Sequence, residues 1–162
     1  MFEQGLDLRK LVPEYYQPIA STLLDEGGMG YGHLPKAVLK FHKYPDQVRT
    51  AIEEHLVEAA LYACSADKIA RLHFTVSPEH KGKIEELLKQ VVPAYEEHFG
   101  YSYKITFSVQ KKATDTIAVD LDNQLFRNKD GSLLFRPGGH GALLDNLNYQ
   151  NEDIVFIKNI DN

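Results

Sequence analysis

The chain has 162 residues, 43% of them hydrophobic and 25% charged, which is the make-up of a globular protein with a core of useful size. Its net charge is −5 and its Lys and Arg residues are scattered, which argues against binding to duplex nucleic acid but not to a nucleotide or a sugar phosphate. A single cysteine, Cys64, no signal-like apolar run and no bilayer-spanning stretch predict a cytoplasmic protein without a membrane partner.

The first part of the chain is predicted to precede the sheet. Residues 1–33 read as a helical and glycine-rich lead-in, and residues 34–162 as the sheet core of one partial domain. Within the lead-in, residues 12–26 predict a helix that is interrupted at Pro18, because proline lacks the amide hydrogen that a helix interior needs.

An extended segment and a helix are expected next. Residues 36–42 read as a short extended stretch. Residues 46–63 carry apolar side chains at helical spacing, beginning with Val48, and Asp46 is a suitable N-cap.

The middle of the chain predicts a strand, a helix and a second strand. Residues 71–77 and 101–109 alternate between apolar and polar side chains, as half-buried strands do. Between them, residues 78–99 predict a helix with Ser77 as its N-cap and a kink or break at Pro93. This order suggests a right-handed crossover that joins a parallel pair of strands.

Two further elements complete the predicted fold. Residues 124–135 read as a small β-hairpin with its turn at 128–131. Residues 154–157 are apolar without alternation, which is typical of a strand buried on both faces. The predicted class is therefore α/β, with three layers and a mostly parallel, Rossmann-like sheet.

Polar side chains occur where the predicted strands end. Ser77, Gln110 and Asp161 lie at or just past the carboxyl ends of three strands. Ligands of open parallel sheets bind beyond these ends. The shared placement indicates a binding site at that edge.

The glycine-rich stretch 136–148, RPGGHGALLDNLN, is a second candidate for ligand binding. Gly138, Gly139 and Gly141 allow positive φ and close backbone approach, and a following helix would direct free N–H groups at an anion or a base edge. A loop that only turns the chain explains the pattern equally well. His140 alone is more often a packed or surface histidine.

Two charged residues fit phosphate chemistry. Lys36 follows Pro35 and is suited to act as a point charge for phosphate. Asp161, at the end of the last predicted strand, is suited to hold a divalent cation. Taken singly, each is better explained as an ordinary solvated residue.

In combination these motifs resemble sugar-1-phosphate nucleotidyltransferases, in particular the uridylyltransferase (pyrophosphorylase) branch. The resemblance implies that Lys36 is catalytic and supports phosphate, that Gln110 and the Gly138–Gly141 loop bind the base, and that Asp161 binds Mg²⁺. It further implies a nucleoside triphosphate and a sugar phosphate as partners, uridylyl transfer with release of pyrophosphate, and a nucleotidyltransferase type of fold. The motifs that carry it are Pro35-Lys36, Gln110, Gly139-His140-Gly141 and Asp161-Asn162.

From Leu34 to Asn162 the chain looks more closely like an uncharacterised bacterial family whose longer members contain a nucleotidyltransferase-like region. The stretches that carry this resemblance include LPKAVLKFHKY, LHFTVSPEH and FIKNIDN. The sequence departs from the enzymes before Pro35, where EGGMGYGH has no arginine and no preceding apolar strand. The expectation is an incomplete fold, cut from a longer protein and inactive in isolation.

Two other functions remain open from the sequence. One is a non-catalytic module that binds a nucleotide or sugar phosphate on a degenerate nucleotidyltransferase fold, because fold does not guarantee chemistry. The other is a glycosyltransferase that uses Asp120 and Asp122 as a metal-binding pair. An incomplete sheet would also expose a strand edge, so a homodimer through that edge is expected.

Overall fold

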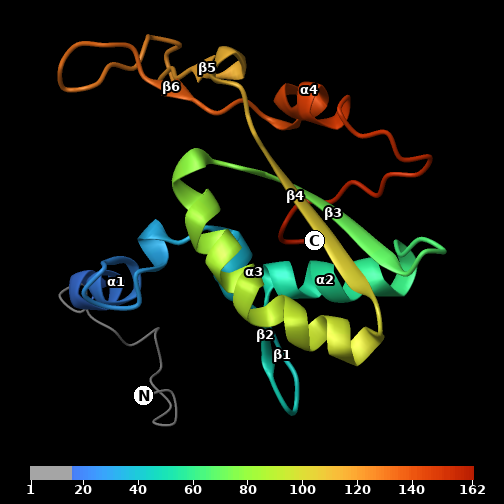
Figure 1. The fold of residues 1–162 in the computed structure, drawn as a ribbon. Coiled ribbons are helices and arrows are strands. Elements are labelled where there is room, and N and C mark those ends of the chain that lie inside the picture. The colour runs from blue at the N-terminus through green and yellow to red at the C-terminus, as the bar shows by residue number, and fades with distance from the viewer. Residues whose placement is uncertain (1–15) are drawn as a thin grey trace.

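The computed structural model describes residues 16–162 and shows a mixed α/β protein with three short two-stranded sheets. One sheet is a parallel pair and two are antiparallel hairpins. Figure 1 shows the α-helices and strands in chain order. They are α1 (Tyr16–Leu24), β1 (Lys40–Lys43), β2 (Val48–Thr50), α2 (Ala51–Tyr62), β3 (Ile69–Val76), α3 (Pro78–Phe99), β4 (Ser102–Val109), β5 (Thr116–Ile117), β6 (Phe135–Arg136) and α4 (Leu144–Leu147).

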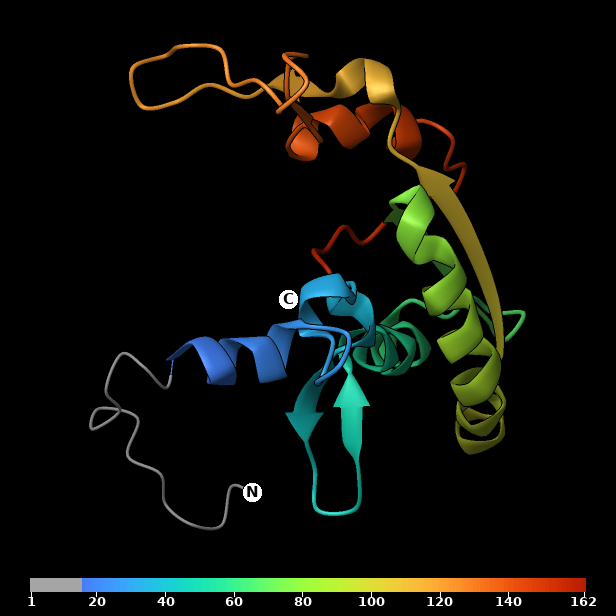
Figure 2. The ribbon, with the colours of Figure 1, turned by 90° about the vertical axis from the view of Figure 1, so that its left-hand side faces the viewer.

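The body of the protein is the parallel pair β3–β4 with the helices α2 and α3. The ladder runs in register from Ile69 opposite Ser102 to Val76 opposite Val109, which confirms the predicted strand–helix–strand unit. Figure 2 shows both helices on one side of β4. The apolar strand residues lie on that face, whereas Thr75, Thr106 and other polar residues form the opposite face. This sheet therefore has one helical layer, and the predicted three-layer, mostly parallel sheet is not what the chain forms.

The core lies between this sheet and the two helices. Ile52 and Leu56 of α2 are fully buried, and Ile84 and Leu88 of α3 pack in the same cluster. Burying an aliphatic side chain of this size stabilises a fold by roughly 1.5–3 kcal/mol. The helices are therefore held on the sheet mainly by these contacts.

Helix α2 begins later than predicted. Its N-cap is Thr50, whose hydroxyl accepts a hydrogen bond from the amide of Glu53, while the Glu53 carboxylate accepts one from the Thr50 amide. This reciprocal capping box satisfies two amides that a helix start leaves free. The predicted cap at Asp46 was wrong, and Val48 belongs to strand β2 rather than to the apolar face of the helix.

Helix α3 has the predicted bounds, and of the predicted kink or break at Pro93 the break does not occur. Ser77 occupies the N-cap position and Pro78 follows at the first helical position. Gly100 ends the helix with φ 67°, a left-handed conformation that glycine adopts without strain. The helix continues through Pro93. Because proline has no amide hydrogen, the carbonyl of Lys89, four residues earlier, loses its helical hydrogen bond, but Lys89 is exposed and water can reach it.

The N-terminal elements differ from the prediction for local reasons. Helix α1 runs through Pro18 without interruption, because Pro18 lies in the first turn, where no amide hydrogen is needed. The predicted residues 12–15 of that helix lie outside the described part of the chain. Residues 36–38 form a short 3₁₀ helix, and only residues 40–43 are the strand that pairs with β2.

Residues 116–136, here called the arm, extend away from the body, as both ribbon views show (Figures 1 and 2). The predicted turn at 128–131 is confirmed. The amide of Gly131 donates a hydrogen bond to the carbonyl of Asn128, and the backbones of Arg127 and Leu133 form an antiparallel β-bridge. At the base of the arm, β5 pairs with β6. Most of the large apolar side chains of the arm are exposed, and only Leu133 and Leu134 are half-buried.

The predicted buried strand at 154–157 was wrong. These four residues form no strand, and their side chains are 45–75% exposed. The segment instead runs along α2 in the opposite direction: the ring of Phe156 lies 5.1 Å from that of Tyr62, and Lys158 binds Glu58 at 2.7 Å. An apolar run becomes a buried strand only where neighbouring elements cover both its faces.

Candidate functional site

Lys36 and Asp161 meet in an ion pair. Lys36 begins the 3₁₀ helix 36–38 directly after Pro35, and Asp161 lies in a turn at 160–161. The Lys36 ammonium donates a hydrogen bond of 2.8 Å to Oδ2 of Asp161, across 125 residues of sequence. Both side chains are open to solvent, with 70% and 40% of their surfaces exposed.

His140 is tied to the same C-terminal segment. Its Nε2 lies 2.8 Å from Oδ1 of Asn159, two residues before Asp161. Since an amide oxygen only accepts, Nε2 carries the proton and donates. The glycine-rich loop and the terminal aspartate therefore lie side by side.

Gln110 connects the end of β4 to the glycine-rich loop. Its Nε2 donates to the carbonyl of Gly138 at 3.4 Å and to the hydroxyl of Thr114 at 3.2 Å. A Cβ on Gly138 would lie only 2.5 Å from the carbonyl oxygen of Thr114, so glycine is required there for close approach. Positive φ, the other predicted reason for these glycines, does not occur at Gly138, Gly139 or Gly141.

The predicted site residues thus form one continuous set of contacts. The segment 159–161 joins Lys36 to His140, and the loop joins His140 to Gln110. Between the two pairs, the carbonyl of Ile160 accepts a hydrogen bond from Nε2 of His55 at 3.1 Å, and its side chain packs on the core cluster. The body of the protein therefore positions the C-terminal segment at this edge.

Ser77 follows β3 at the same end of the sheet. Val76 and Val109 are the last paired residues of β3 and β4, so Ser77 and Gln110, which follow them, lie at neighbouring strand ends. The Ser77 hydroxyl lies 2.8 Å from Nδ1 of His80 and makes no cap to the helix backbone. Its hydroxyl is thus already engaged by a side chain of α3.

The charges of the ion pair shape the site. The ammonium of Lys36 holds the pKa of Asp161 below its usual value, with help from a backbone hydrogen bond, so the carboxylate is ionised at neutral pH. The described residues contain no group of three or more His, Cys, Asp or Glu side chains that could hold a metal. Asp161, the predicted magnesium ligand, accepts its hydrogen bond from Lys36 in this structure, and its role as a metal ligand stays a prediction.

A second polar network lies on the open face of the sheet, and the sequence reading did not identify it. Nε2 of His73 and Nδ2 of Asn146 each lie 2.8 Å from the hydroxyl of Ser108, and Nδ1 of His73 lies 2.8 Å from that of Thr106. Burial lowers the pKa of His73. Asn146 also donates to the carbonyl of Val109, which fixes α4 against the end of β4. The alternating polar positions of the strands were its only sequence signal.

The predicted alternative metal pair lies in the arm. One oxygen of Asp120 accepts hydrogen bonds from the amides of Asp122 and Gln124 at 2.9 and 2.8 Å. Asp120 therefore closes a tight turn, which is a common structural use of aspartate.

Comparisons with known proteins give one match. The profile of a family described as "Domain of unknown function (DUF4301)" matches residues 2–162. Neither the curated proteins nor the solved structures yielded a match. Among residues 16–162, no helix combines the length and the apolar character needed to cross a membrane.

Proposed function

The chain belongs to the DUF4301 family, a domain of unknown function. We propose that it binds a nucleoside triphosphate at the edge where its glycine-rich loop meets its C-terminal segment. The observation that carries the proposal is the connected set of contacts from Lys36 through Asp161, Asn159 and His140 to the loop. It brings a cation, a carboxylate and a close-approach glycine loop into one set of contacts, which reaches the carboxyl end of β4 through Gln110, and ligands of parallel sheets bind beyond such ends.

Each group has a chemical role in such a complex. The Lys36 ammonium would pair with phosphate oxygens, and Asp161 would hold Mg²⁺, which neutralises phosphate charge. The side-chain oxygen of Gln110 accepts no hydrogen bond from the described residues, so it can accept one from an N–H group of the base. Backbone groups of residues 138–141 would contact the base of the same ligand.

The finer proposal is nucleotidyl transfer to a sugar 1-phosphate. A phosphate oxygen of the sugar would attack the α-phosphorus of the triphosphate, and pyrophosphate would leave. Uridine triphosphate as the donor is supported by the order of Pro35-Lys36, Gln110, Gly139-His140-Gly141 and Asp161 along the chain, which resembles that of uridylyltransferases. Transfer of this kind rests mainly on positioning and charge stabilisation.

One observation favours a non-catalytic binding module as the second candidate. Lys36 and Asp161 neutralise each other in this structure, at 2.8 Å. A nucleotide bound with Mg²⁺ would have to separate the two side chains, so that Lys36 meets the phosphates and Asp161 meets the cation. A module that only binds a phosphate needs Lys36 alone to turn towards the ligand.

Isothermal titration with uridine triphosphate and Mg²⁺ tests the binding proposal. We expect a Kd tighter than about 1 mM, which corresponds to about −4 kcal/mol. Lys36→Gln and Asp161→Asn should weaken binding by about tenfold or more, because each removes a charge that meets the phosphates. The matched controls are Lys40→Gln and Asp153→Asn, two exposed residues outside the site, and they should bind as the parent does.

The same protein separates the two candidates. Pyrophosphate release from uridine triphosphate with glucose 1-phosphate as the probe would support transfer, and binding without release would support the module. Failure of all tested nucleoside triphosphates and of glucose 1-phosphate to bind more tightly than about 1 mM would reject both.

A further inference from the structure

The outer edge of β4 has no partner strand. The sheet contains two strands, so the edge of β4 that faces away from β3 is unpaired within residues 16–162. Eight residues, Ser102–Val109, make this edge, which is long for an unprotected one. Figure 2 shows β4 at the margin of the molecule with no strand beside it.

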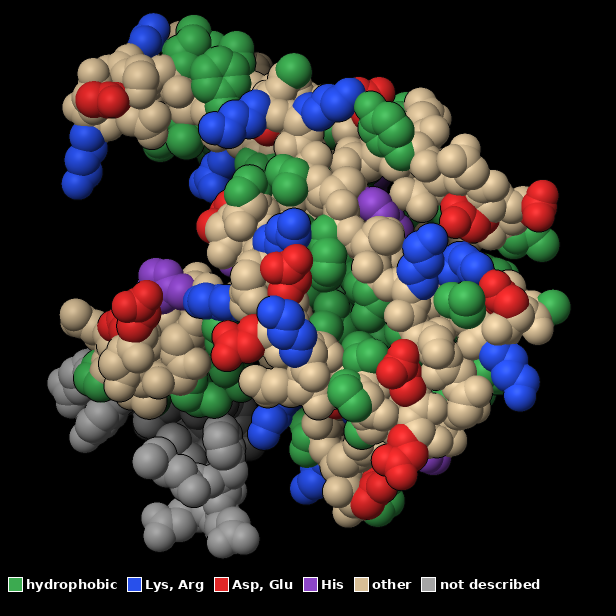
Figure 3. Space-filling view, viewed as in Figure 1, with side chains coloured by type: hydrophobic (Ala, Val, Ile, Leu, Met, Phe, Trp, Pro, Cys, Tyr) green, Lys and Arg blue, Asp and Glu red, His purple; other side chains and the backbone are tan. Residues whose placement is uncertain are grey.

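An apolar groove runs beside this edge. It has a volume of about 340 Å³ and lies between α3 and β4. The space-filling view shows an apolar strip along it (Figure 3). Its lining combines four residues of α3 with two of β4: Glu85, Leu88, Lys89, Val92, Ile105 and Phe107.

We infer that β4 pairs with β4 of a second copy of the chain, antiparallel and about a twofold axis at Thr106, so that the two apolar grooves merge. An isologous pair of this kind is the commonest homodimer, and it removes the exposed edge. The inference does not depend on the proposed nucleotide site.

The strand is complementary to itself in this register. Ile105 of one copy lies opposite Phe107 of the other, and both face the helical layer, so the apolar strip continues across the axis. On the other face, Thr106 meets Thr106, and Lys104 lies opposite Ser108 rather than another cation. Threonine pairs stabilise antiparallel strands, and like charges directly opposite each other destabilise them.

The charges beside the groove are complementary as well. Glu85 and Lys89 lie one turn apart on α3, and both line the groove. When two antiparallel α3 helices flank the axis, Glu85 of one copy comes near Lys89 of the other, and the reverse holds by symmetry. Within the chain, Glu85 already pairs with Lys81 at 3.7 Å. A second copy covers the apolar part of this surface and adds an opposite charge for Lys89, which is why we name it as the occupant.

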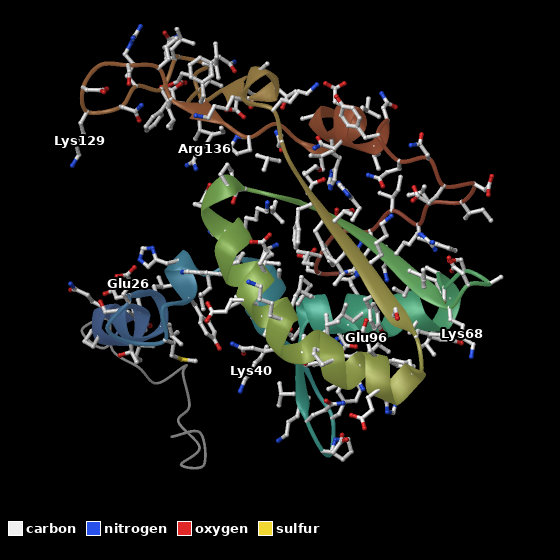
Figure 4. The ribbon with its side chains drawn as sticks, viewed as in Figure 1. Glu26, Lys40, Lys68, Glu96, Lys129 and Arg136 are labelled. Atoms are coloured by element: carbon white, nitrogen blue, oxygen red, sulfur yellow. The ribbon has the colours of Figure 1, made fainter. Side chains whose placement is uncertain are left out.

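Charge reversal tests the geometry directly. Sedimentation equilibrium of the full chain should show a dimer. Glu85→Lys and Lys89→Glu should each raise the dimer Kd about tenfold or more, because each places like charges across the axis. An equimolar mixture of the two variants should restore the dimer, since their charges are then opposite. Lys129→Glu, at the arm (Figure 4), carries the same charge change as Lys89→Glu and should leave the Kd unchanged.

Cross-linking gives a second readout that does not depend on affinity. Opposed residues of antiparallel strands have Cα atoms about 4.5–5.5 Å apart, within reach of a disulfide. Oxidised Thr106→Cys should therefore form a covalent dimer, and Leu121→Cys in the arm should not. A monomeric parent protein, a dimer that both charge variants leave intact, or singly mutated copies that fail to recombine would overturn the inference.

Discussion

The body and the segment that follows it are held together by different forces. Within residues 51–109 lie nearly all the buried apolar side chains, among them Ile52, Leu56, Ile84 and Leu88. After Val109, the one buried residue of the described chain is Asn146, which is polar. That later segment is held by hydrogen bonds and ion pairs to the body rather than by a core of its own.

This difference assigns stability and the predicted ligand binding to different parts of the chain. All the predicted site residues except Lys36 and Ser77 lie after the body, in the region without a core. Regions with few buried apolar contacts open locally at low free energy, and binding loops are commonly drawn from them. The body is therefore expected to set the stability of the protein and the later segment its interactions. Four experiments test this expectation.

The largest expected effect is that of a cavity in the body. Leu56→Ala should lower the free energy of unfolding by about 2–5 kcal/mol, because Leu56 is fully buried in the cluster between the helices and the sheet. Leu121→Ala, the same change in the arm at a fully exposed position, should shift it by less than about 0.5 kcal/mol. Urea denaturation followed by circular dichroism measures both. Equal losses would show that the arm is packed in solution.

A smaller effect is expected at the start of α2. Thr50→Ala removes the hydroxyl of the capping box and should lower the free energy of unfolding by about 1 kcal/mol. Thr116→Ala, in the exposed β5, is the matched control and should change it by less than about 0.5 kcal/mol. Denaturation midpoints compare the two. A cost at Thr50 no greater than at Thr116 would mean that α2 does not depend on its cap.

The body was largely predictable from sequence because its signals are local. Ser77, Pro78 and Gly100 bracket α3, and alternation marks β3 and β4. The pattern Thr50-x-x-Glu53 is a local capping-box signal of the same kind, and it, rather than the predicted Asp46, begins α2. Such signals lie within a few residues of the element they specify, so they need no knowledge of the rest of the fold.

The later segment was predicted less well because its structure depends on distant partners. Residues 154–157 have the composition of a buried strand, but in the described chain they lie along α2 with 45–75% of their surface exposed. The pairing of Lys36 with Asp161 joins residues 125 positions apart, and Asn159 carried no signal that it would meet His140. A motif order identified the candidate residues, and only the structure shows which of them touch.

The hydrogen bond of His140 should affect the segment without affecting the body. His140→Ala removes the donor to Asn159, so the amides of residues 159–162 should exchange faster with deuterium. The free energy of unfolding should change by less than about 1 kcal/mol. His33→Ala, also exposed, is the control for loss of an imidazole. Hydrogen exchange with mass spectrometry reads both variants, and unchanged exchange at 159–162 would mean that the loop does not hold the segment.

The smallest expected effect is the acid titration of Asp161. Because Lys36 lowers the pKa of this carboxyl, the stabilisation from the pair is present above the ordinary aspartate pKa and is lost as the pH falls through the lower, folded value. Carbon NMR of the Asp161 carboxyl should show the pKa rising towards its ordinary value in Lys36→Gln and staying in place in Lys40→Gln. Salt should also raise it in the parent protein, since both side chains are exposed to counterions. A pKa that changes with neither the Lys36 substitution nor salt would mean that the pair with Lys36 does not form in solution.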